Sequence, residues 1–358
     1  MFIENIKTVA SNQLLNPIKT SSRPPVFGRN EEGGTNDVWQ ESLEKSLSSF
    51  LENHPTVRYP QQATGLSDLA LYRPKTGIKP YHLPPVTLSK TELKRLSAAV
   101  EGCLQAGALI MRDYQKKHLI KCKRHAKDLQ TDTDVNADTL ISKILHVAEP
   151  DAELLTEETY QDSKKYNLSK TWIVDPLDGS TNYSHGYPNF SVSIAFIENG
   201  KPTMGVVLDL PKGTLYTAIK GKGAWSEGKR LKVSTVKDLN KTLLAGGYPW
   251  GSTGNPSRKA VNFFNDMDLK SQGIKAFGGV LGGTYTGAGL IDGYWTHYTR
   301  PWDQAASMLI ATESGAKVTD FEGKAVDLSQ PILKLVTANP VIHNQILKEF
   351  KKNSGKQQ

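Results

Sequence analysis

An apolar segment that runs directly into two carboxylates is the feature that most restricts how this chain can fold. Trp172, Ile173 and Val174 favour a buried strand, and Asp175 and Asp178 follow them closely. An ionised carboxylate is costly to bury unless a counter-charge or a metal neutralises it. The pattern therefore predicts a buried strand that ends at a site holding positive charge.

Strand and helix patterns are interleaved along much of the chain. Ser89 and Glu92 match a capping box ahead of an amphipathic helix, and Asn199-Gly200 matches a hairpin turn. A Gly-rich region at 276–293 is expected to pack closely as a helix or turns. Further helices are expected at residues 134–146 and 302–314 and near the C-terminus, and strands at 154–155, 171–174, 190–198, 203–208, 213–219, 317–319 and 333–338. The interleaving predicts a layered α/β fold.

The first 86 residues have a different character, because they hold nine of the nineteen prolines and show little periodicity apart from residues 38–51, which match a short helix. We expect residues 1–86 to form an extended or partly disordered arm. Residues 87–352 are expected to form the folded domain, and residues 353–358 a basic tail.

Charge, cysteine content and hydropathy limit the class of protein. The net charge of +8 comes from dispersed lysines without a nucleic-acid-binding motif, so we expect no nucleic-acid partner. Two cysteines are too few for a disulfide framework and favour a reducing, cytoplasmic location. No apolar run approaches the roughly 18 residues of a membrane span. The weakly amphipathic residues 1–15 lack a secretory signal but leave organelle targeting open.

The residues after the buried strand suit a cation and an anion together. Asp175 is expected at the carboxyl end of the strand, where open α/β sheets place ligands. Pro176 is expected to help stop the strand, which leaves the Leu177 carbonyl to face a cation and lets Asp178 add a second carboxylate. Gly179 allows close backbone approach, and residues 180–182 can open a helix whose first amides suit an anion. A divalent metal between the carboxylates and a phosphate would remove their mutual repulsion.

Further carboxylates are expected to converge on the same place. Glu157 and Glu158 end the preceding strand, and Asp303 begins the helix that Pro301 opens. Oxygen ligands from separate loops, without a His or Cys cluster, suit Mg²⁺ or Mn²⁺ better than Zn²⁺. Two or three such ions polarise a phosphoryl group and activate a water molecule.

Residues 172–182, Trp-Ile-Val-Asp-Pro-Leu-Asp-Gly-Ser-Thr-Asn, resemble the first signature of the inositol monophosphatase family. That family belongs to the lithium-sensitive, Mg²⁺-dependent phosphatase superfamily that also holds fructose-1,6-bisphosphatase. The resemblance implies a layered αβαβα fold with mixed sheets, direct hydrolysis of a small phosphate monoester by metal-activated water, inhibition by Li⁺ and a homodimer. Residues 301–315 resemble the second signature, and further matches lie at 128–134, 156–158, 221–225, 289–293 and 336–339.

The resemblance also implies roles for individual residues. It places the phosphate on the amides of Gly179 and Ser180. It places the attacking water on Glu157 and the Ser180 hydroxyl, with Asp134 supporting Ser180, and it brings Lys123 near the metals. The implied metal ligands are Glu157, Asp175, the Leu177 carbonyl, Asp178 and Asp303.

One departure from the family pattern bears on the substrate. Thr296, seven residues before Asp303, stands where relatives usually carry a glutamate that binds a sugar hydroxyl. Thr296, Arg300 and Lys123 are the expected substrate contacts. The missing acid weakens inositol 1-phosphate as the substrate, and fructose bisphosphate, histidinol phosphate and other sugar phosphates remain candidates.

Two interpretations from other classes stay open. A covalent aspartyl phosphatase would need a closer pair of acids than Asp175 and Asp178, with a nucleophilic Asp leading the motif. A non-catalytic binding or regulatory protein on the same fold would use the arm and the basic surface for a macromolecular partner. At the level of single residues, Asp175 and Asp178 could be plain turn acids, and Lys123 plain surface charge.

Overall fold

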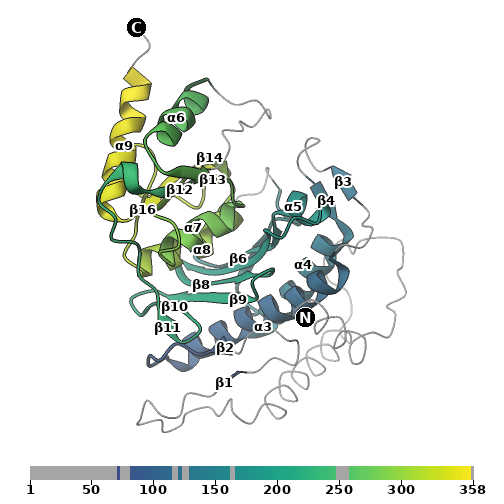
Figure 1. Cartoon of the computed structure of the whole chain (residues 1–358). Coiled ribbons are helices and arrows are strands. Elements are labelled where there is room, and N and C mark those ends of the chain that lie inside the picture. Colours follow the sequence, from purple (N-terminus) through teal and green to yellow (C-terminus); the bar gives the residue numbers. More distant parts are fainter. Residues whose placement is uncertain are drawn as a thin grey trace, which may run out of the picture.

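The structure of the chain is a computed structural model that describes residues 71–72, 81–114, 120–122, 129–161, 166–246 and 258–355. Five layers are formed, in which helix pairs alternate with two mixed β-sheets (Figure 1). Helices α3 and α4 cover one face of the first sheet, α7 and α8 lie between the sheets, and α6 and α9 pack on the second sheet. The layered α/β fold with mixed sheets expected from the sequence is confirmed. The helix expected at residues 38–51 lies outside the described residues.

The first sheet carries the two acids of the opening motif. Its order is β11-β10-β9-β8-β7-β6-β5, and only β5 and β6 run parallel to each other. The carboxyl ends of β5 and β6 therefore meet at one edge. The strands are β5 (Glu153–Thr156), β6 (Lys170–Asp178), β7 (Ser191–Glu198), β8 (Lys201–Asp209), β9 (Thr214–Ile219), β10 (Gly223–Ser226) and β11 (Lys229–Arg230).

Strand β6 is longer than the sequence indicated. It does not stop at Pro176 but continues to Asp178, because a bulge accommodates the proline. Asp175 pairs with Ser193 and Asp178 with Ser191, so three steps on β6 face two steps on β7. In a regular strand, residues three apart point to opposite faces, and a bulge changes that direction. The bulge is therefore what allows both carboxylates to share one site.

Sequence patterns predicted only β15 and β16 of the second sheet. Its order is β13-β12-β14-β16-β15, with β12 parallel to β13 and β14 and the remaining pairs antiparallel. Its strands are β12 (Leu243–Gly246), β13 (Gly273–Lys275), β14 (Gly293–Thr299), β15 (Lys317–Thr319) and β16 (Leu333–Ala338). Two small antiparallel sheets pair β1 (Leu71–Tyr72) with β2 (Tyr81–His82), and β3 (Ile120–Cys122) with β4 (Leu129–Thr131).

Local signals placed several element boundaries correctly. The Ser89 and Glu92 capping box begins α3, and Asn199 and Gly200 both take positive φ in the β7–β8 turn. The helices are α3 (Lys90–Asp113), α4 (Asp132–Ala148), α5 (Ser180–Ser184), α6 (Arg258–Leu269), α7 (Gly279–Gly287), α8 (Pro301–Glu313) and α9 (Pro340–Gly355), with a 3-10 turn at Leu239–Lys241. No described helix is both long and apolar enough to cross a membrane.

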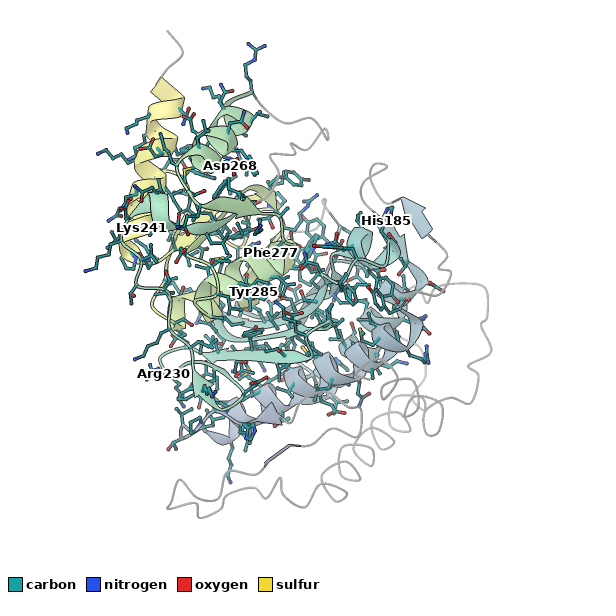
Figure 2. All side chains as sticks on the ribbon, viewed as in Figure 1. His185, Arg230, Lys241, Asp268, Phe277 and Tyr285 are labelled. Atoms are coloured by element: carbon teal, nitrogen blue, oxygen red, sulfur yellow. The ribbon has the colours of Figure 1, made fainter. Side chains whose placement is uncertain are left out.

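Glycines bring α7 and α8 into close contact between the sheets. A Cβ on Gly283 would lie 2.9 Å from the Ser307 hydroxyl, and one on Gly287 would lie 2.9 Å from the Ala311 backbone. Tyr285 of α7 packs in the same layer (Figure 2). The Gly-rich region expected to pack closely therefore does so, and it fixes where α8 begins.

Candidate active site

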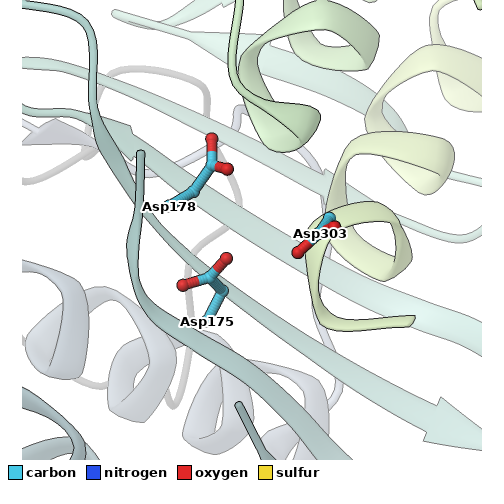
Figure 3. Close-up of side chains that lie close together, drawn as sticks. All are labelled: Asp175, Asp178 and Asp303. Carbon is cyan, nitrogen blue, oxygen red and sulfur yellow. The ribbon is translucent and has the colours of Figure 1, made fainter. Parts of the chain in front are cut away.

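Three aspartates from two distant parts of the chain meet at the edge of the first sheet. Asp175 and Asp178 come from β6, and Asp303 comes from the first turn of α8 (Figure 3). Each contributes a carboxylate oxygen to a group whose atoms all lie within 4.8 Å of one another. Asp175 and Asp178 are buried, with 1% and 8% of their surface exposed. Such a group suits a divalent cation bound through oxygen.

Asp303 is held by its own helix start. Its Oδ2 atom accepts hydrogen bonds from the Arg300 amide at 2.9 Å and from the Thr299 hydroxyl at 2.6 Å. Pro301 occupies the first turn, where its missing N–H costs nothing. Gly279 of α7 packs so closely that a Cβ there would lie 2.8 Å from the Asp303 Cβ. The position of Asp303 therefore depends on the contact between α7 and α8.

The electrostatics of Asp178 favour a cation. Burial, and then the negative charge of Asp303, raise the pKa of Asp178 to about 7, although hydrogen bonds from Val280, Gly279 and Ser191 act in the opposite direction. The Val280 amide lies 3.3 Å from Oδ2, and the Ser191 hydroxyl lies 3.4 Å away. The buried carboxylate of Asp178 and the half-buried carboxylate of Asp303 repel each other, and both are stabilised as anions when a cation lies between them.

A cavity of about 180 Å³ opens at these carboxylates. Glu157, and not Glu158, contributes to its wall, although Glu157 is not part of the tight group of three. The Leu177 amide donates to Asp175 Oδ1 at 3.0 Å, which fixes that carboxylate. The lining residues are Glu157, Asp175, Leu177, Asp178, Gly179, Ser180, Thr181 and Asp303. All five predicted metal ligands therefore reach one cavity, while their role as ligands stays a prediction.

Ser180 and Asp134 form a hydrogen-bonded pair beside the cavity. The Ser180 hydroxyl donates to Asp134 Oδ1 at 2.7 Å, and Asp134 is fully buried. Asp134 also accepts from the Thr131 amide at 2.8 Å and from the Thr131 hydroxyl, as the capping box of α4. Burial raises the pKa of Asp134, while these hydrogen bonds act to lower it. The helix cap thus holds Asp134 where it can orient Ser180.

Only glycine fits at the start of α5. Gly179 has a φ of 89°, and a Cβ there would lie 2.9 Å from the Asn189 carbonyl oxygen. The left-handed backbone turns the chain from β6 into α5 within one residue. Gly179 and Ser180 both line the cavity.

Two of the three predicted substrate contacts, Thr296 and Arg300, do not line the cavity. Thr296 is buried, and its hydroxyl donates to the Tyr298 carbonyl at 3.0 Å. Arg300 donates to the Pro331 carbonyl at 2.8 Å, with its guanidinium 5.6 to 5.8 Å from three aromatic rings. Lys123 lies outside the described residues. Their substrate roles stay predictions, and the observed contacts of Arg300 are structural.

Sequence reasoning did not identify the residues that support the acids. Thr299 holds Asp303 and the Val280 amide holds Asp178. Gln304 donates to the Thr299 hydroxyl and to the Gly279 carbonyl, which belongs to the same peptide group as the Val280 amide. The glycines at positions 278 and 279 were the available signal, because glycine marks close approach of backbone. A Cβ on Gly278 would lie 2.3 Å from Asp178 Oδ2.

Comparison with known proteins gives a consistent result. The profile of the inositol monophosphatase family matches residues 92–354. A fructose-1,6-bisphosphatase/inositol-1-monophosphatase of Thermotoga maritima is 32% identical over 258 residues, which are 72% of this chain and 95% of the relative. The Nus factor SuhB of Escherichia coli is 33% identical over 234 residues, which are 64% of this chain and 85% of that protein.

Solved structures agree with the sequence comparison. An inositol monophosphatase of Thermotoga maritima has a TM-score of 0.65 at 29% identity, covering 73% of this chain and 98% of that one. The extragenic suppressor protein SuhB of Bartonella henselae has a TM-score of 0.66 at 31% identity, covering 72% and 98%.

Proposed function

The chain belongs to the inositol monophosphatase family, and we propose that it hydrolyses a small phosphate monoester with Mg²⁺ as cofactor. One observation carries the proposal: three aspartates meet within 4.8 Å beside the hydrogen-bonded Ser180 and Asp134 pair. Carboxylates that converge under burial need a cation, and a phosphatase needs one at the same place.

The donor set fits a hard divalent cation. Every side-chain oxygen in the tight group is a carboxylate oxygen, and burial together with Asp303 opposes the ionisation of Asp178 when no cation is bound. Two or three Mg²⁺ ions, with Mn²⁺ as an alternative, would be held by Glu157, Asp175, the Leu177 carbonyl, Asp178 and Asp303. When bound, such ions supply positive charge to the phosphoryl oxygens and lower the pKa of a water molecule.

Ser180 and Glu157 are proposed to orient the attacking water. A hydroxyl has one proton and two lone pairs. The Ser180 hydroxyl donates to Asp134 Oδ1 at 2.7 Å or to the Leu177 carbonyl at 3.0 Å, and in either case its lone pairs can accept a hydrogen bond from water in the cavity. Glu157, which follows the end of the neighbouring strand β5, can accept the other proton of that water. The Gly179 and Ser180 amides are proposed to hold the phosphate.

The substrate is proposed to be an inositol phosphate or a related sugar or polyol phosphate. Fructose bisphosphate and histidinol phosphate are the alternatives, because Thr296 supplies no acid for a sugar hydroxyl. We also propose inhibition by Li⁺, a homodimer and a cytoplasmic location for this chain. We propose in addition that the chain is divided into an arm of residues 1–86, a catalytic domain of residues 87–352 and a basic tail of residues 353–358.

A regulatory function is the second candidate, because several relatives carry the name Nus factor SuhB. A purely regulatory protein would have no need for cation-binding carboxylates, a wall position for Glu157 and an oriented Ser180 in one cavity. Those features support the hydrolase. A measurement of phosphate release distinguishes the regulatory function from the catalytic one.

A phosphate-release screen over these monoesters, with Mg²⁺ and with a chelator, tests the proposal. We expect release that requires Mg²⁺ and falls more than about 100-fold in Asp178→Asn, because one preorganised polar group commonly contributes that much. Circular dichroism establishes that the variant is folded. If the intact protein binds Mg²⁺ but releases no phosphate from any ester, the hydrolase is wrong and the regulatory candidate gains support.

A further inference from the structure

Gln304 is a fully buried amide that the proposed reaction does not use. It directly follows Asp303 in the first turn of α8, and none of its surface is exposed. Its Nε2 atom donates to the Gly279 carbonyl at 3.0 Å and to the Thr299 hydroxyl at 3.1 Å. These two acceptors lie on different elements, at the start of α7 and at the end of β14. The amide therefore lies next to one carboxylate of the site and reaches the element that supports another.

The support of Asp303 runs through the Thr299 hydroxyl. A hydroxyl has one proton to donate, and an amide NH₂ group can only donate. Because Gln304 donates to Thr299, the Thr299 oxygen is the acceptor in that contact, and its own proton is left for Asp303 Oδ2 at 2.6 Å. Gln304 thereby sets the direction of the hydrogen bond that Asp303 receives.

The support of Asp178 runs through the start of α7. The Val280 amide donates to Asp178 Oδ2 at 3.3 Å, directly after the residue whose carbonyl Gln304 contacts. The orientation of the Gln304 amide follows from chemistry, because a carbonyl only accepts and so must face Nε2. One side chain therefore ties the supports of Asp178 and Asp303 to each other.

We propose that Gln304 is a positioning residue that holds Asp178 and Asp303 at the separation a bound Mg²⁺ requires. The inference rests on the proposed function, since it concerns the cation of that same site. Gln304 itself is not proposed to contact the substrate. Residues that support metal ligands in this way usually change metal affinity when they are replaced.

The Gln304 Oε1 atom gives the proposal a distinctive readout. It is buried without a hydrogen-bond partner among the residues that the structure describes. Gln304→Met loses the two hydrogen bonds that Nε2 donates, but it also removes this unpaired buried oxygen, so the two effects on the stability of the metal-free fold offset each other. Gln304→Met should therefore weaken Mg²⁺ binding while the metal-free protein keeps nearly the same melting temperature.

Calorimetric titration of the full-length protein with Mg²⁺ tests the proposal. We expect Gln304→Met to weaken Mg²⁺ binding by about tenfold or more. Ser314→Ala is the matched control, because it removes a buried hydroxyl that donates to the Ile310 carbonyl at the other end of α8. That control should leave Mg²⁺ affinity unchanged.

Thr299→Val is a second variant, which removes the hydroxyl that accepts from Gln304 and donates to Asp303. If Gln304 acts through Thr299, the losses of Mg²⁺ affinity in Gln304→Met and Thr299→Val will not add in the double variant. Additive losses, or a Gln304→Met affinity within about twofold of the intact protein, would overturn the proposal. Mg²⁺ binding without phosphate release would reject the hydrolase alone, whereas no Mg²⁺ binding by the intact protein would reject both.

Discussion

At the scale of single residues, burial and the negative charge of Asp303 both raise the pKa of Asp178. Its pKa of about 7 in the folded, metal-free protein lies above the ordinary value of 3.8. The folded state therefore binds more protons than the unfolded state between these two values. The contribution of this proton to the free energy of unfolding therefore falls as pH rises through that window, by at most about 1.4 kcal/mol for each pH unit.

The first prediction concerns this pH dependence. In the presence of a chelator, the free energy of unfolding of the intact protein should fall between pH 5 and pH 8 relative to Asp178→Asn, which cannot ionise. Urea denaturation of both proteins at the two pH values measures the difference. A difference that is constant with pH, or that grows in favour of the intact protein, would contradict the assigned electrostatics.

The second prediction concerns the Ser180 hydroxyl. Ser180→Ala removes the group that Asp134 orients at 2.7 Å, so phosphate release at saturating Mg²⁺ should fall by about 100-fold or more. Ser180→Thr is the matched control, because it keeps a hydroxyl and should retain most of the rate. Steady-state kinetics of the three proteins decide the matter, and an unchanged rate in Ser180→Ala would exclude a role for this hydroxyl.

At the scale of elements, the α7–α8 contact determines where Asp303 lies. The third prediction is that Gly283→Ala lowers both the melting temperature and the affinity for Mg²⁺. The new Cβ would lie 3.0 Å from the Ser307 Cβ and force the helices apart. Overpacking of this kind costs about 1 to 3 kcal/mol, which exceeds the gain of about 1 kcal/mol from replacing glycine in a helix.

Gly102→Ala in α3 is the control for that prediction. Its Cβ would meet the Ile194 Cδ1 atom at 3.1 Å, in the core on the other side of the first sheet. Thermal denaturation with and without Mg²⁺ distinguishes the two sites. If both variants change Mg²⁺ affinity equally, the α7–α8 contact has no special part in the site.

At the scale of the whole molecule, the site joins β6 of the first sheet to α8 between the sheets, so cation binding is coupled to folding. The fourth prediction is that Mg²⁺ raises the stability of the folded protein, by about 2.7 kcal/mol at 100 times its dissociation constant. The stabilisation should be smaller at pH 5 than at pH 8, because protonated Asp178 must first release its proton.

Melting curves over a Mg²⁺ series at the two pH values measure this coupling, and excess chelator should reverse it. Asp178→Asn should show a much smaller shift at either pH. An equal shift in that variant would mean that Mg²⁺ binds elsewhere on the molecule.

The sequence by itself determined the chemical parts of the site and several local boundaries. Spacing and residue type identified Asp175, Asp178 and Asp303 as acids that should converge, and all three do. The capping box at Ser89 and the turn at Asn199-Gly200 were equally readable, because caps and turns depend on a few neighbouring residues.

Only the tertiary structure decided how those parts are aimed. The bulge in β6 turns Asp175 and Asp178 to one side, and Gln304 reaches Gly279 across the α7–α8 contact. Thr296 and Arg300 donate hydrogen bonds to backbone carbonyls, and neither residue lines the cavity. Such directions depend on contacts between segments far apart in the chain, and no local pattern of residues encodes those contacts.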